Sequence, residues 1–167
     1  MKLLHKIRCL FNPHLAAGHK AEQAFEKLCE QNGYAWEKIS QDKQSFRRYA
    51  ALTKYAKRGD YLIRNNNVEV EVKCLKVYGN KTPYQYLAWK DLKRHKQMED
   101  FTRSRVVFAF FEKNGRKVRE DSVRMIPLAE LMPAQNRKFG IFYDEKNKSL
   151  RIPRHVMHSG FELFKHF

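Results

Sequence analysis

The sequence predicts an α/β domain in which helices flank a central mixed β-sheet. Three patterns carry this prediction: apolar residues at helical spacing over 18–34, an alternating β-hairpin over 57–74, and the apolar run RVVFAFFE over 105–112. The apolar run is long enough and rich enough in β-branched residues to form a buried central strand. Helices and strands that follow one another in this way are typical of a sheet covered by helices.

The expected elements follow one another without a clear linker. The helix over 18–34 carries Ala21, Phe25 and Leu28 on one side, and Gly33 stands at its end, where glycine often terminates a helix. The other expected elements are a strand over 34–40, a basic helix or ordered loop over 44–58, the hairpin, a helix over 84–101, the central strand, a strand over 122–128, a weaker hairpin over 140–152 and a short helix over 160–167 that docks on the body.

Length and composition limit the domain organisation. The 167 residues, 43% of them hydrophobic, suffice for one domain with a real core and are too few for two comfortable ones. We expect a single domain over 1–167, with its core at about 18–131 and a C-terminal extension at 135–167. Three widely spaced cysteines support neither a disulfide framework nor a zinc ribbon. Because the N-terminus lacks a long apolar stretch, we expect the protein in the cytoplasm.

The charge of the chain predicts a polyanionic partner. Lys and Arg number 34 against 18 Asp and Glu, which gives a formal net charge of +16. Nucleic acid is the first candidate for such a partner. An anionic membrane surface is the second, but the sequence has no long apolar run and no polybasic amphipathic helix with a bulky apolar face.

The hairpin, KRGDYLIRNNNVEVEVKC, gathers charged residues on one face. Glu69, Glu71 and Lys73 share that face, while the intervening valines point to the core. A turn of two or four residues at the three asparagines places Asp60 directly across from Glu71. A three-residue turn would rotate Asp60 onto the apolar face. The even turn also buries Tyr61 against a valine, so packing favours it.

Two carboxylates and a lysine on adjacent strands have the chemistry of a metal site. Asp60 and Glu71 repel each other unless a cation lies between them. Oxygen ligands suit Mg²⁺ or Mn²⁺ rather than zinc, and the backbone carbonyl of Val72 could complete the set. Lys73 would point into the same site, where an ammonium can orient water or offset charge in a transition state. A solvated face with weak ion pairs fits the same pattern, so the hairpin alone leaves both interpretations open.

These residues resemble the PD-(D/E)XK nuclease superfamily, with a layout closest to archaeal-type Holliday-junction resolvases. The resemblance rests on Glu22 in the first helix, then Asp60, then EVK at 71–73 in a hydrophobic strand, and it spans about 18–131. It implies a restriction-endonuclease-like core and a Mg²⁺-dependent DNA endonuclease that is commonly dimeric. The metal ligands would be Asp60 and Glu71, the catalytic lysine Lys73, and Glu22 an accessory acid. Gly59 stands where the family often has proline.

Further residues are candidates for contact with DNA. One stripe of the helix expected over 84–101 could track a phosphate backbone or simply face solvent. The segment before Asp60 mixes positive charge with aromatic side chains that could stack on bases or pack in the core. The candidates are Arg47, Arg48, Lys54, Lys57, Arg58, Lys90, Lys93, Arg94 and Gln97. Asp91 and His95, four residues apart, are expected to satisfy each other.

Other functions fit parts of the same pattern. A restriction-type or mobile-element nuclease would use the same residues, and a DNA-binding module could keep the fold without cutting. We favour the nuclease because the chain carries all three of Asp60, Glu71 and Lys73.

Overall fold

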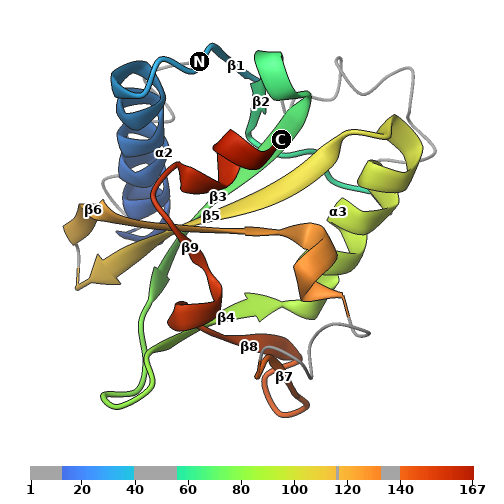
Figure 1. Ribbon diagram of the computed structural model, residues 1–167. Coiled ribbons are helices and arrows are strands. Elements are labelled where there is room, and N and C mark those ends of the chain that lie inside the picture. The colour runs from blue at the N-terminus through green and yellow to red at the C-terminus, as the bar shows by residue number, and fades with distance from the viewer. Residues whose placement is uncertain (1–12, 40–55, 116, 133–139) are drawn as a thin grey trace.

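Figure 1 shows the computed structural model, which describes residues 13–39, 56–115, 117–132 and 140–167. Its helices and strands, in chain order, are α2 (Pro13–Gln31), β1 (Trp36–Lys38), β2 (Tyr61–Ile63), β3 (Val68–Lys76), β4 (Tyr84–Ala88), α3 (Trp89–Thr102), β5 (Arg105–Asn114), β6 (Lys117–Pro127), β7 (Phe142–Asp144), β8 (Ser149–Pro153) and β9 (His158–Ser159). Four short 3₁₀ turns complete the described elements: η2 (Arg64–Asn66), η3 (Leu128–Leu131), η4 (Arg154–Val156) and η5 (Glu162–His166).

The main sheet is mixed, as the sequence predicted. Its strand order is β1-β2-β3-β5-β6-β9, in which β3 and β5 are parallel and the other neighbours are antiparallel. The apolar run at 105–112 lies in β5, between β3 and β6, which confirms it as a buried central strand. A second sheet has three antiparallel strands in the order β4-β8-β7.

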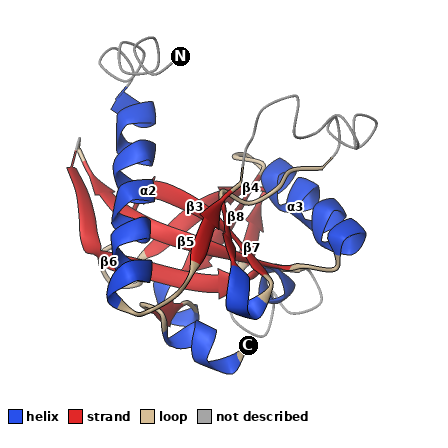
Figure 2. Cartoon of the chain, turned by 90° about the horizontal axis from the view of Figure 1, so that it is seen from above, coloured by secondary structure: helices blue, strands red, loops and turns tan. Residues whose placement is uncertain are grey.

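Helices cover the main sheet on opposite sides, as Figure 2 shows for α2 and α3. Alternate residues of β5 enter two separate apolar clusters. Phe25 of α2 packs in the cluster that includes Val107 and Phe111, whereas Leu92 of α3 packs in the one that includes Phe108. The α/β class with a flanked central sheet is therefore confirmed. No helix within the described ranges is long and apolar enough to span a membrane.

The hairpin has the even register. Tyr61 pairs with Val70 and Ile63 pairs with Val68. The connection is the four-residue form, made by the turn η2 and by Asn67, whose φ of 50° lies in the left-handed region. Asparagine adopts that region more easily than most residues, which explains its presence there.

The helix expected over 84–101 begins later than predicted. Tyr84–Ala88 form β4, and α3 begins at Trp89. Within β4, Gln85 and Leu87 are buried while their neighbours are more exposed, which is the two-residue period of a strand. Strand β4 pairs with β8, more than 60 residues away in the sequence. That distant partner overrides the helical pattern that leucine and alanine offered locally.

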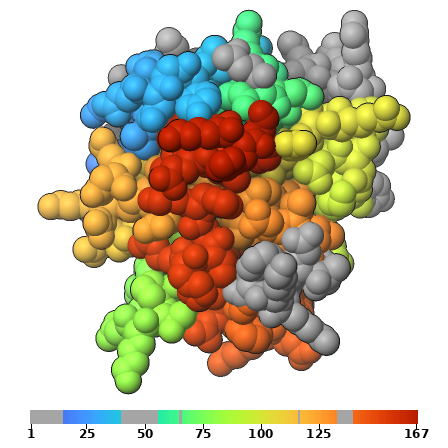
Figure 3. Space-filling view, viewed as in Figure 1, coloured from blue at the N-terminus to red at the C-terminus, as the bar shows by residue number. Residues whose placement is uncertain are grey.

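The C-terminal segment packs on the body. Strands β7 and β8 form the predicted hairpin, and β9 joins the edge of the main sheet. In Figure 3 the red C-terminal segment lies against the blue helix α2. The ring centroid of Phe161 lies 5.6 Å from those of Phe25 and Tyr34, and Phe164 is buried in the same cluster. The docking of residues 160–167 is thus confirmed, and its turn is a 3₁₀ turn rather than an α-helix.

Candidate active site

The charged face of β3 is buried. The exposed fraction is 0% for Glu69 and 2% for Glu71, and Lys73 is half-buried. Helix α3 lies over this face, because Asp91 and His95 contact Lys73 and Glu71. Surface ion pairs on a solvated strand would leave these carboxylates in water, so the solvated-face interpretation is excluded. Buried carboxylates persist only where cations or hydrogen bonds compensate for lost hydration.

Glu69 holds the segment that precedes β2. Its Oε1 accepts hydrogen bonds from Arg58 Nε at 3.0 Å and Nη2 at 2.7 Å, and its Oε2 accepts one from the Gly59 backbone N–H at 3.0 Å. Both carboxylate oxygens are therefore used in fixing residues 58 and 59 against β3. A charge-assisted pair of this kind is stronger than a neutral hydrogen bond. Arg58 was predicted to bind DNA; its guanidinium is engaged with Glu69, and DNA contact stays a prediction.

Gly59 brings the chain close to β3. A Cβ atom at this position would lie 2.9 Å from the Val70 carbonyl oxygen and 3.0 Å from its carbonyl carbon, closer than such atoms approach in proteins. Only glycine allows this approach. The next residue, Asp60, then donates its backbone N–H to the Val70 carbonyl at 2.8 Å. The glycine thus places Asp60 at the start of β2, beside the charged face.

The Asp60 side chain hydrogen-bonds the backbone of β3 beyond the last β2–β3 pair. Its Oδ2 accepts a hydrogen bond from the Val72 backbone N–H at 2.8 Å, just past the last β2–β3 pair. In a strand, the N–H and C=O of one residue point to the same neighbour. The Val72 carbonyl therefore points toward the Asp60 side, where β2 does not cover it.

The pKa of Asp60 is raised to about 7. Burial is the largest cause, the negative charge of Glu71 is the second, and Glu22 adds to it. The hydrogen bond from Val72 and the charge of Lys57 oppose the shift only in part. Two carboxylates close together in a poorly solvated place cannot both ionise easily. The pair therefore retains a proton near neutral pH unless a further cation joins it.

Glu71 lies at the centre of the site. Its Oε1 contacts the ammonium groups of Lys57 and Lys73, the latter at 2.7 Å. Its Oε2 lies 3.4 Å from His95 Nε2 but meets no hydrogen-bond partner among the described residues. Burial alone would raise the pKa of Glu71, but His95 and the two lysines outweigh burial and lower it well below the usual range. Glu71 is therefore ionised in the folded protein.

Lys73 bridges β3 and α3. Its Nζ lies 2.9 Å from Asp91 Oδ2 in addition to its contact with Glu71. Burial would lower the pKa of Lys73, but these two carboxylates raise it above its ordinary value. Lys73 is thus protonated at neutral pH. The predicted mutual pair of Asp91 and His95 is wrong, because both residues face β3 and Asp91 finds its partner there.

His95 is the site residue that the sequence did not reveal. It is completely buried, and neither ring nitrogen has a hydrogen-bond partner among the described residues. Its ring meets that of Phe108 edge-on with centroids 5.2 Å apart. Buried polar groups are nearly always hydrogen-bonded, so an unsatisfied one needs an explanation such as a catalytic role or contact with a water or an ion. The available signal was a pair of polar residues, Asp91 and His95, four positions apart on an apolar helix face.

Glu22 lies at the rim of the site. Its carboxylate binds Lys38 Nζ at 2.6 Å, and the same ammonium is 3.3 Å from the Tyr61 hydroxyl. Glu22 contributes to the raised pKa of Asp60, so the two are electrostatically linked. The structure brings Asp60, Glu71, Lys73 and Val72 together, and it leaves Glu22 beside them with a lysine partner.

The donor set fits a hard divalent cation in part. No group of three or more His, Cys, Asp or Glu within the described ranges is arranged as a ready metal site. Asp60 and Glu71 are nevertheless adjacent, Glu71 Oε2 is an orphaned buried oxygen, and the Val72 carbonyl faces the same side. Two carboxylates, a carbonyl and water are the ligands that Mg²⁺ and Mn²⁺ prefer. Lys57 and Lys73 supply positive charge at Glu71.

The residues predicted to contact DNA occupy different places. Lys90, Lys93 and Gln97 are exposed on α3, and Lys93 Nζ lies 5.5 Å from the Trp89 ring centroid. Arg94 is half-buried and accepts a hydrogen bond from the Lys57 backbone N–H at its carbonyl. Arg47, Arg48 and Lys54 lie outside the described residues.

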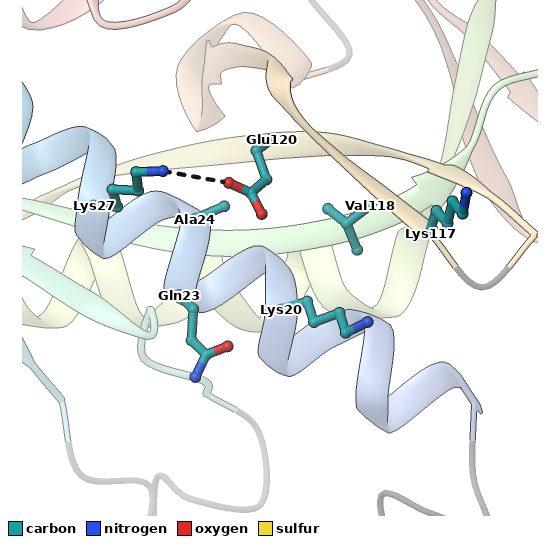
Figure 4. A pocket seen from close by; sticks show the side chains of 7 residues that line it. All are labelled: Lys20, Gln23, Ala24, Lys27, Lys117, Val118 and Glu120. Carbon is teal, nitrogen blue, oxygen red and sulfur yellow. Dashed lines mark ion pairs between the residues drawn. The ribbon is translucent and has the colours of Figure 1, made fainter.

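A separate hollow of about 470 Å³ lies between α2 and β6 (Figure 4). Three lysines line it, two from α2 and Lys117 from β6, and one of them, Lys27, lies 3.8 Å from the Glu120 carboxylate. The lining is mostly long, exposed side chains, so this hollow has no built arrangement of buried polar groups.

Comparison with known proteins identifies the fold. No family model matches the sequence, and no curated protein is similar to it in sequence. Among solved structures, the chain is similar to Hjc, a Holliday junction resolvase from the archaeal hyperthermophile Archaeoglobus fulgidus. The identity is 14%, the TM-score is 0.55, and the match covers 87% of this chain and 98% of that chain.

The chain is thus an α/β protein whose central mixed sheet is flanked by helices, in a fold similar to that of this structure. Its layout is similar to that of this archaeal resolvase, which agrees with the resemblance in the sequence. At 14% identity this likeness concerns the fold, and the function has to be argued from the site.

Proposed function

We propose that this chain is a metal-dependent DNA endonuclease that hydrolyses phosphodiester bonds, with a preference for branched DNA such as Holliday junctions. One observation carries the proposal: Asp60, Glu71 and Lys73 meet on a buried polar face where β2 ends, within a resolvase fold. Burial of this face costs free energy that ordinary surface ion pairs do not. Because burying these charged residues costs stability, we infer that they are present for function.

Asp60, Glu71 and the Val72 carbonyl are the proposed metal ligands. A bound Mg²⁺ or Mn²⁺ supplies Lewis-acid polarisation of the phosphate and a more acidic water. Glu71 is already ionised, and Asp60 can give up its proton at neutral pH because its pKa is about 7. The Val72 N–H fixes Asp60 Oδ2 and leaves the other carboxylate oxygen to turn toward Glu71.

Lys73 is the proposed catalytic cation. Glu71 and Asp91 hold its ammonium from two sides, at 2.7 and 2.9 Å, and keep it protonated. A lysine with a raised pKa is a poor general base, so its role is electrostatic. It would orient the attacking water and stabilise charge that develops on the phosphate oxygens in the transition state.

The excess of positive charge supports DNA as the substrate. The formal charge of +16 attracts a polyanion along its whole length. Lys90, Lys93 and Gln97 lie on the exposed side of the helix whose other side contacts the site, so they could track a phosphate backbone that enters it. A homodimer, as the resemblance implies, would place two such sites on a symmetric junction.

The test is cleavage of a DNA panel with and without divalent metal. Wild-type protein is incubated with Mg²⁺, Mn²⁺ or chelator and with a four-way junction, linear duplex and single-stranded DNA. We expect metal-dependent cutting, fastest on the junction. Asp60→Asn should abolish it, whereas Asp100→Asn, the same change at a position 62% exposed on α3, should not. If no DNA is cut under any condition, a non-cutting DNA-binding module is the better interpretation.

A further inference from the structure

The small sheet presents aromatic rings on its outer face. Leu87, Leu150 and Ile152 on the inner face are buried in the apolar cluster under α3. The outer face carries four rings and one guanidinium, which we call the aromatic face: Tyr78, Tyr84, Tyr86, Arg151 and Phe142. The sheet lies at the lower end of the molecule in Figure 1, and the loop that joins β3 to β4 projects beside it in Figure 3.

Strand register fixes these groups in two rows. Tyr86 pairs with Arg151, which in turn pairs with Phe142, so three planar side chains lie side by side across β4, β8 and β7. With neighbouring strands about 4.8 Å apart, the row extends across about 10 Å. Tyr78 pairs with Tyr84 next to this row through two backbone hydrogen bonds, each of 2.9 Å.

The rings are held in place but remain accessible. Tyr84 and Tyr86 have centroids 5.4 Å apart, and Tyr78 lies 5.8 and 5.6 Å from them. The Tyr86 hydroxyl donates to Asp144 Oδ2 at 3.0 Å, which anchors that ring further. Tyr78 is 40% exposed and Phe142 is 63% exposed. Tyr78 and Phe142 are thus available for contact with a partner.

Cations accompany the rings. The Arg151 guanidinium carbon lies 3.8 Å from the Tyr84 ring centroid, and Lys76 Nζ lies 5.2 Å from that of Tyr78. Positive charge beside stacked, accessible rings is the arrangement by which proteins bind unpaired nucleotides. The bases stack on rings or guanidinium planes, and the phosphates meet the cations. Duplex DNA offers no free base faces, because its bases stack on one another.

We propose that the aromatic face binds single-stranded nucleic acid by stacking unpaired bases. Phe142 and Tyr78 are the accessible stacking surfaces, Arg151 contributes both a plane and a charge, and Tyr84 and Tyr86 support them. Base–aromatic stacking is sequence-tolerant, since every base has a π face. This surface is distinct from Asp60, Glu71 and Lys73 and does not depend on the proposed cleavage.

The test is fluorescence anisotropy without divalent metal, so that nothing is cut. The probes are labelled oligothymidylate, labelled oligouridylate and a labelled blunt duplex. We expect Phe142→Ala and Tyr78→Ala each to weaken binding of the single strands about tenfold. Binding of the duplex should change less than twofold. The DNA and RNA arms show whether one sugar is preferred over the other.

Matched variants separate stacking from other effects. Tyr78→Phe keeps the ring and should bind single strands as wild type does, and Arg151→Lys keeps the charge but should lose part of the affinity. Phe142 is so exposed that Phe142→Ala should fold normally, which thermal unfolding checks. Equal losses for single strand and duplex, or no loss for either, would overturn the proposal. Because the assay contains no metal, its result is independent of whether the chain cuts DNA.

Discussion

At the scale of single residues, the protonation of Asp60 is the feature with the most direct consequence. Burial and the negative charge of Glu71 raise its pKa from the ordinary 3.8 to about 7. The folded protein therefore binds a proton that the unfolded chain releases. Stability that depends on this proton is present below about pH 4 and is lost as the pH rises to about 7.

Asp60→Asn should remove this pH dependence. Asn keeps the oxygen that accepts the Val72 hydrogen bond but never ionises. We expect the variant to match the metal-free wild type near pH 4 and to exceed it at pH 8, on the order of 2 to 4 kcal/mol. Urea unfolding of both proteins at several pH values, with chelator present, measures the difference. If the free energy of unfolding depended on pH in the same way in both proteins, the pKa of Asp60 would not be raised.

His95 should position Glu71 for metal binding. Its Nε2 lies 3.4 Å from the orphaned Oε2 of Glu71, so a small rotation completes a hydrogen bond. Loss of such an outer partner typically weakens metal binding about 10- to 100-fold. We expect His95→Leu to bind Mn²⁺ at least about tenfold more weakly by calorimetry, with His95→Gln closer to wild type. Equal Mn²⁺ affinity in all three proteins would leave His95 a packing residue.

At the scale of elements, the short connection from Gly59 to Asp60 links the hairpin to the site. Gly59→Ala pushes a methyl group against the Val70 backbone at 2.9 Å and displaces Asp60. We expect a loss of about 1 to 3 kcal/mol in stability together with weaker Mn²⁺ binding. Denaturant unfolding and calorimetry measure the two effects.

Gly18→Ala is the matched control for this change. Gly18 lies within α2, and a methyl group there meets nothing within 4 Å. Alanine in a helix should stabilise the chain by up to about 1 kcal/mol and leave metal binding unaltered. If Gly59→Ala behaved as Gly18→Ala does, the close approach of the chain to β3 would not matter.

Some elements of the fold could be predicted from the sequence, whereas strand β4 could not. The hairpin register, the central strand β5 and the tail hairpin followed from local patterns, because turn length and alternation act over a few residues. Strand β4 did not, because its partner β8 is distant in the sequence. The proximity of Asp60 and Glu71 could be predicted, because both residues lie in one hairpin whose register depends on the length of its turn. The spacing of Asp91 and His95 indicates that both lie on the inner face of α3, but which residues of β3 they contact depends on how the helix packs over the sheet.

At the scale of the whole molecule, we expect the net charge of +16 to drive the proposed association with DNA. If six or more phosphates are contacted, affinity for random duplex should fall on the order of a thousandfold between 50 and 200 mM salt. Anisotropy titrations over this range, without metal, measure the slope. A flat response would mean that the positive charge serves another purpose.

We propose that the buried polar face of β3 performs chemistry, and substitution of Lys73 is the most direct test. Lys73→Ala should bind a four-way junction within a few-fold of wild type, because the lysine is placed to act on the transition state. It should cut the junction at no more than about a hundredth of the wild-type rate. Lys117→Ala, which removes an exposed lysine of β6, is the control for loss of charge and should cut normally. Equal cutting rates for the two variants would contradict the account.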